Sequence, residues 1–275
     1  MRTPIALIAA TVALSAGVAH AASVEIDDAV ARITVIPEAR SDIKVEVVRA
    51  HPQLPLAIRS LGGKTIIDGD LDRRIRNCSG DGTGASVEVR GVGRVAYADM
   101  PHVVIRTPRE VDLSADGAVF GEVGRSTSLK FGNAGCGDWT VANVDGAMQI
   151  SQAGSGDSRT GSAGEAKIRI AGSGNVATAE VRGGADVNIA GSGDVAMVSI
   201  GGPLSVSIAG SGDVSVAGGA ATEVSVSIAG SGDVDFRGSA QTLKARVMGS
   251  GDVRAREVKG EVTRTIMGSG AVTIG

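Results

Sequence analysis

A short acidic motif recurs through the second half of the chain, and stacked carboxylates at a fixed spacing can bind metal ions. The motif reads Gly-Ser-Gly-Asp in most copies, as at 210–213. Calcium takes several oxygen ligands, and the candidate ligands are Asp194, Asp213, Asp233 and Asp252. We expect a turn role and no metal, because Asp is a common turn residue and because Asn175 and Ala271 break the acidic column. Weak cation binding remains an alternative, because stacked like charges repel one another and a bound cation would offset that repulsion.

The sequence lacks the residues that nucleotide binding or catalysis would need. A nucleotide loop requires a P-loop or a G-x-G-x-x-G motif that opens a helix, and the sequence offers no such context. Catalysis requires a nucleophile and a base at one place, whereas His51 and His102 have no partner in register with the repeat. We therefore predict no catalytic residues and no cofactor.

The motif marks a repeat with a nearly constant period, and a fixed period of this size indicates a solenoid. The first glycine of each motif stands at position 135, 154, 172, 191, 210, 230, 249 or 268. Glycine adopts backbone conformations that other residues avoid, so each motif is predicted to be a corner. The structural corner residues are Gly154, Gly172, Gly191, Gly210, Gly230, Gly249 and Gly268.

The segments between the corners alternate apolar and polar residues, which predicts strands with one inward face. Leu204–Ile208 and 224–228 show the pattern, and valine usually follows the acid. We predict an all-β fold: a single-stranded parallel β-helix whose coils stack at about 4.8 Å. Trp139 occupies the valine position of the first registered coil, where we expect it to fill the core.

The chain divides into three predicted parts. Residues 1–21 have the pattern of a secretory signal peptide, residues 22–112 form an N-terminal β region and residues 113–275 form the repeat. The N-terminal region is either a separate layer or a set of irregular coils that caps the solenoid. Export to an oxidising compartment favours a disulfide between Cys78 and Cys136. Met248 and Met267 replace the alanine before the last two corners and form a candidate association surface.

Composition excludes several partners. Aromatic residues make up 2% of the chain and the net charge is −3, so a nucleic-acid-binding surface is not expected. The apolar segment near the N-terminus is too short to span a membrane. We expect an exported protein that is periplasmic, surface-bound or extracellular.

The GSGD, GSGN and GSGA corners of residues 134–275 resemble those of the putative auto-transporter adhesin head GIN domain family. That resemblance implies a pectin-lyase-like shape, no recognised catalytic set and a role in adhesion. The chain departs from the pattern at Cys136, Ser158, Asn175 and Ala271, which argues against a ligand role for every acid.

Three functions follow from these expectations. The first is an adhesin-like, non-enzymatic β-helix that binds a glycan or a cell-envelope or host-surface protein through its repetitive polar faces. The alternatives are a polysaccharide-active enzyme of β-helix fold and a structural envelope protein. The structural protein would assemble as a homo-oligomer through its C-terminal end.

Overall fold

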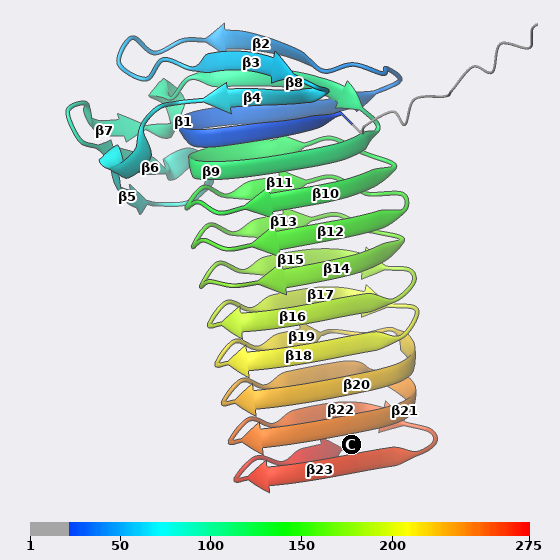
Figure 1. The fold of residues 1–275 in the computed structure, drawn as a ribbon. Coiled ribbons are helices and arrows are strands. Elements are labelled where there is room, and N and C mark those ends of the chain that lie inside the picture. Colours follow the sequence, from blue (N-terminus) through cyan, green and yellow to red (C-terminus); the bar gives the residue numbers. More distant parts are fainter. Residues whose placement is uncertain (1–21) are drawn as a thin grey trace, which may run out of the picture.

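The structure is a computed structural model, and it describes residues 22–275. The expected signal peptide, residues 1–21, lies outside the described residues. Within 22–275 the chain forms strands and three short 3-10 helices, with no α-helix. The strands stack as a parallel β-solenoid, with about nine turns over residues 110–274 (Figure 1). The all-β class and the parallel β-helix predicted from the repeat are confirmed.

Each turn contributes one strand to each of two sheets. Face A denotes the sheet of strands that lead into the GSGD corners, and each of its strands pairs in parallel with the equivalent strand of the next turn. Its separate strands are β10 (Ser128–Asn133), β12 (Ala147–Gln152), β14 (Glu165–Ile170), β16 (Ala185–Gly191), β18 (Leu204–Gly210) and β23 (Val262–Gly268). Identical positions face one another, as in the pairing of Ser207 with Ser227.

Face B denotes the sheet of strands that follow the corners. Its separate strands are β11 (Trp139–Val141), β13 (Ser158–Thr160), β15 (Val176–Val181), β17 (Val195–Ile200), β19 (Val214–Val216), β22 (Val253–Val258) and β24 (Val272–Ile274). Three longer strands bend around the edges of the solenoid, namely β9 (Glu110–Val123), β20 (Ala220–Gly230) and β21 (Val234–Gly249). The first half of β9 belongs to face A and its second half to face B.

The inward side chains of the two sheets form one continuous core. The valines that follow the corner acids are buried as the alternation predicted, at Val176, Val195, Val214, Val234, Val253 and Val272. Trp139 is 1% exposed and packs against Phe131 with ring centroids 4.8 Å apart. Its ring neighbours are small: a Cβ on Gly121 would lie 2.3 Å from the indole, and Ser158 pairs with Trp139 in the next turn. The core role expected of Trp139 is confirmed.

The N-terminal strands continue the same solenoid, which decides between the two predicted arrangements. Strand β1 (Ser23–Glu38) pairs in parallel with β9 on one side. On its other side it pairs with β4 (Lys64–Asp68) and β8 (His102–Pro108). Two antiparallel strands, β2 (Lys44–Arg49) against β8 and β3 (Ala57–Leu61) against β4, lie at this end of the stack (Figure 1). The region therefore forms irregular early turns that end in antiparallel strands.

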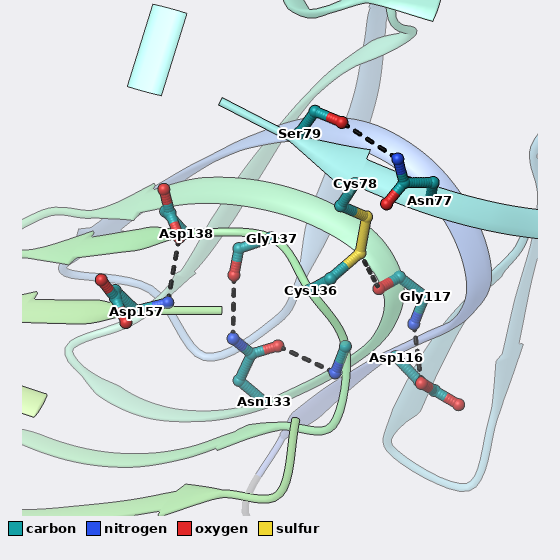
Figure 2. Close-up of a disulfide and its surroundings, with 11 residues drawn as sticks. Asn77, Cys78, Ser79, Asp116, Gly117, Asn133, Cys136, Gly137, Asp138 and Asp157 are labelled. Atoms are coloured by element: carbon teal, nitrogen blue, oxygen red, sulfur yellow. Dashed lines mark hydrogen bonds between the residues drawn. A yellow bond between two sulfur atoms is a disulfide. The ribbon is translucent and has the colours of Figure 1, made fainter. Parts of the chain in front are cut away.

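A small antiparallel sheet, termed the insertion, lies against the outside of these early turns. It consists of β5 (Ile75–Ser79), β6 (Ser86–Val89) and β7 (Gly93–Ala96), with 3-10 helices at Asp72–Arg74, Gly82–Gly84 and Tyr97–Asp99. Its apolar side chains bury the outward residues Val30, Ala118 and Phe120 in a second core. The predicted disulfide is confirmed, and it joins Cys78 of β5 to Cys136 of the first GSGD-type corner (Figure 2).

The C-terminal end of the solenoid is an exposed sheet edge. Met248 and Met267 point outward and are 42% and 57% exposed. The last turn carries an arginine on the inward side, because Arg264 pairs with the buried Ala245. Its Nη1 donates to the Val272 carbonyl at 3.3 Å, so the guanidinium reaches from face A to face B across the open end of the core. A charged group at such an edge opposes strand-to-strand association.

Candidate functional site

The acid of each corner accepts a hydrogen bond from the backbone of the next turn. Oδ1 of Asp213 accepts a hydrogen bond from the Asp233 amide at 2.7 Å, and the Asp213 amide donates to Oδ1 of Asp194 at 2.8 Å. Figure 2 shows the first such bond, between Asp138 and Asp157. The acceptors of this Asp ladder are Asp138, Asp157, Asn175, Asp194, Asp213, Asp233 and Asp252. The ladder satisfies one backbone donor in each turn.

The two positions that break the acidic column fit this role. Asn175 offers an amide Oδ1 in place of a carboxylate, and the Asp194 amide donates to it at 2.9 Å. Ala271 needs only its backbone N–H, which donates to Oδ1 of Asp252 at 2.9 Å. An oxygen acceptor, and not a charge, is therefore the common requirement of the ladder.

The four candidate calcium ligands are largely engaged with protein groups. Each of them accepts a backbone hydrogen bond through Oδ1. Arg254 also contacts Oδ2 of Asp233 at 3.1 Å and Oδ2 of Asp252 at 2.6 Å. Among residues 22–275, no three His, Cys, Asp or Glu side chains converge in a geometry that would hold a metal ion.

The corner glycines are required chiefly because successive turns approach closely. A Cβ on Gly154 would lie 1.9 Å from the carbonyl oxygen of Gly135, and one on Gly212 would lie 2.2 Å from that of Gly193. From Gly191 onward the first glycine also has positive φ, such as +148° at Gly210. Gly212 does not have a left-handed φ. At that position the close contact with the backbone of the previous turn alone excludes a side chain. The sequence explains the corner glycines by backbone conformation and does not reveal this contact.

A groove runs along face A, parallel to the solenoid axis. It encloses about 1030 Å³ and crosses the turns from β9 to β20. Its floor lies over one inward, buried position in each strand, occupied by Val111, Leu129, Met148, Ala166, Ala185 and Leu204. An outward polar row borders this floor, with Asp112, Lys130, Gln149, Lys167, Asp186, Ser205 and Ser225 in register. We call this hollow the axial groove.

The other border of the axial groove is acidic. Glu110, Glu165 and Glu223 occupy the same column at intervals of three turns, with uncharged residues between them. These three glutamates are exposed, and none forms an ion pair among the described residues. The lysines of the polar row are compensated, because Lys130 lies 3.1 Å from Asp112 and Lys167 lies 3.9 Å from Asp186. The groove therefore presents uncompensated negative charge along one side.

The remaining residues singled out in the sequence lie elsewhere. The outward polar row before the corners, which includes Ser207 and Arg246, lies on face A between the groove and the corners. His51 precedes the turn after β2. His102 begins β8 and lies half-buried in a second hollow beside the insertion. Burial, followed by the nearby Arg32 charge, lowers the pKa of His102.

A cluster of aspartates that the sequence analysis did not single out surrounds the bend of β1. Asp28 has a φ of +46°. Burial, and then the charges of Asp116 and Asp72, raise the pKa of its carboxyl. The pKa of Asp27 is raised by burial and then by Asp68. The N-terminal strands have no GSGD motif, so the repeat pattern gives no signal for this cluster.

Comparison with known families identifies the chain. The family described as "Putative auto-transporter adhesin, head GIN domain" matches residues 100–220 and 200–275. The match spans most of the chain, and the protein belongs to this family of putative adhesins. A comparison with curated proteins gave no match. Residues 22–275 contain no helix that is long and apolar enough to cross a membrane.

Proposed function

We propose that the protein is an exported, adhesin-like binding protein and that its axial groove binds an extended basic segment of a partner polypeptide. The observation that carries the proposal is the acidic border of the groove. Adjacent turns are separated by about 4.8 Å, so Glu110, Glu165 and Glu223 recur every 14 Å or so. An extended chain rises about 3.3 Å per residue, so a cation at every fourth residue would match them.

The lining of the groove favours a polypeptide over a glycan. No aromatic ring lines it, whereas aromatic rings are the usual surface on which sugar rings stack. The groove crosses the turns from β9 to β20, a length that suits an extended peptide. The charge on the border is complementary to lysine or arginine, and such complementarity gives specificity and fast association.

Export and the absence of catalysis belong to the same proposal. The signal-peptide pattern of the sequence and the Cys78–Cys136 disulfide both support an oxidising compartment. The family's description as an adhesin supports binding rather than turnover. The structural-protein alternative would use the C-terminal edge, where Arg264 opposes association.

The test uses peptides of nine residues with lysine at the first, fifth and ninth positions and apolar or small residues between. A peptide of equal composition with its three lysines adjacent serves as the spacing control. We expect the spaced peptide to bind more tightly, and its affinity to fall as salt rises. A glycan array run in parallel tests the other ligand class.

A matched pair of variants places the binding site. The triple variant Glu110→Gln, Glu165→Gln and Glu223→Gln should lose binding of the spaced peptide. The control, Glu46→Gln, Glu180→Gln and Glu257→Gln, removes the same charge at exposed positions outside the groove and should keep it. Equal binding of both peptides, equal loss in both variants, or selective binding of a neutral glycan would refute the proposal.

A further inference from the structure

A second hollow, which we call the junction pocket, lies where the insertion meets face B. It encloses about 410 Å³, within the range of small-molecule sites. Tyr97 and Gly82 of the insertion form one side. The other side is formed by β1, β8, β9, β11 and β13 and by the corner acid Asp138; its charged and polar residues include Arg32, Thr34, His102, Glu122, Thr140 and Arg159. The sequence gives no hint of this pocket, because it forms between the insertion and strands that are distant from it along the chain.

Arg32 is a cation that lacks an anionic partner in the described part of the chain. Its Nε is buried without a hydrogen-bond acceptor. Its guanidinium lies over the Tyr97 ring, with Cζ 5.2 Å from the centroid, and Tyr97 packs edge-on against Phe120 with centroids 5.8 Å apart. These contacts hold the charge in one place, which preorganises it for an incoming anion.

A chain of hydrogen bonds beside Arg32 fixes the neighbouring polar groups. The Thr34 hydroxyl donates to Oε1 of Glu122 at 3.1 Å and lies 3.1 Å from Nε2 of His102. A hydroxyl that has given its proton to a carboxylate accepts from the ring N–H. His102 therefore carries its proton on Nε2 and leaves Nδ1 as an acceptor. Burial, and then the Arg32 charge, lowers the pKa of His102, which favours the neutral ring.

The carboxylates of the junction pocket restrict what the arginines can bind. Asp138 uses Oδ1 for the Asp157 amide and keeps a second oxygen, and Glu122 likewise has one oxygen outside its bond to Thr34. Both would repel a dense anion such as phosphate. They would accept hydrogen bonds from hydroxyl groups. A ligand with one carboxylate for Arg32 and several hydroxyls for Glu122, Asp138 and Thr140 satisfies all of these groups.

We infer that the junction pocket is a binding site for a carboxylate-bearing sugar. Arg32 holds the carboxylate, and Arg159 supplies a second cation. Arg159 lies two turns beyond Glu122 in the same outward column of face B. The Glu122, Asp138 and Thr140 oxygens recognise the sugar hydroxyls. The site is separate from the axial groove, which lies on face A, so the two proposals can fail independently.

Calorimetry on the mature chain tests the inference with three probes: glucuronate, glucose and glutamate. Glucuronate should bind at least about tenfold more tightly than glucose, because a charge-assisted hydrogen bond is lost with the carboxylate. Arg32→Gln should weaken glucuronate binding by a similar factor, and Arg159→Gln, at an exposed position, should weaken it several-fold. Arg246→Gln removes an exposed arginine of face A and should leave the affinity unchanged.

Histidine NMR gives a readout that does not depend on affinity. Saturating glucuronate should raise the pKa of His102, because an anion then offsets the Arg32 charge, while His51 serves as the internal reference. Arg32→Gln should raise the pKa of His102 even without ligand. The inference is overturned if glucuronate fails to bind at millimolar concentration, if glucose or glutamate binds as tightly, or if folded Arg32→Gln or Arg159→Gln binds like the parent.

Discussion

The Asp ladder leads to a prediction that separates the roles of oxygen and charge. In Asp213→Asn the side chain keeps Oδ1, so the bond to the Asp233 amide, 2.7 Å long, remains, and one of a row of like charges disappears. We expect a change in unfolding free energy within about 0.5 kcal/mol, as for neutral surface changes. Asn175 already makes the equivalent bond in this chain.

Asp213→Ala removes the acceptor and leaves the Asp233 amide without its protein partner. The position is exposed, so water replaces the lost bond and the cost should be about 1 kcal/mol. For a chain of this size that cost corresponds to a fall in Tm of roughly 2–4 °C. Ser215→Ala, at an exposed outward position of β19, is the matched control.

Thermal and urea unfolding measure both variants, and hydrogen exchange of the Asp233 amide reports the bond itself. Exchange should stay slow in Asp213→Asn and become faster in Asp213→Ala. The reasoning is refuted if Asp213→Asn costs as much as Asp213→Ala, since the charge would then be the essential feature. A calcium-dependent rise in Tm that Asp213→Asn abolishes would also contradict it.

Four further predictions concern other parts of the molecule. Gly212→Val should cost about 3 kcal/mol or more, because its Cβ would lie 2.2 Å from the Gly193 carbonyl oxygen; a Tm equal to that of the parent would show that the turns can separate. Replacing Cys78 and Cys136 by serine should cost about 2–4 kcal/mol by opening a 58-residue loop, measured against the oxidised parent; a cost equal to zero would show that the cross-link does not stabilise the fold. Asp28→Asn should raise Tm at pH 7 and not at pH 3. The raised pKa of Asp28 means that its contribution to stability is present at acidic pH and lost as pH rises through that pKa, and a gain that persists at pH 3 would contradict this assignment. Arg264→Val should increase self-association by light scattering, because it removes the charge from the exposed edge; an unchanged mass would show that Arg264 does not protect this end.

The repeat made most of the solenoid predictable. The GSGD period locates the corners, and the alternation around Leu204–Ile208 assigns the buried face. The core position of Trp139 follows from the same register. The disulfide follows from the cysteine count and the compartment. These inferences depend on local patterns repeated many times, which is why a single sequence is sufficient for them.

The parts that escaped prediction depend on contacts between turns or between distant segments. The link from the Asp213 carboxylate to the Asp233 amide joins residues that are adjacent only after stacking. Strand β1 lies between β4, β8 and β9, an order that the chain sequence does not reveal. Arg32, His102 and Glu122 meet through that order, and so the junction pocket could not be read from spacing.

The central claim, that the axial groove binds a basic extended segment, is tested most directly by photo-crosslinking. A nine-residue peptide with lysines four residues apart would carry a photoreactive group at its centre, and mass spectrometry would locate the attachment. The proposal predicts attachment to the turns between Glu110 and Glu223 on face A, at outward residues such as Gln149, Lys167 or Ser205. It also predicts loss of that attachment when the three groove glutamates are replaced by glutamine. Attachment to face B or to the insertion, unchanged by those replacements, would contradict it.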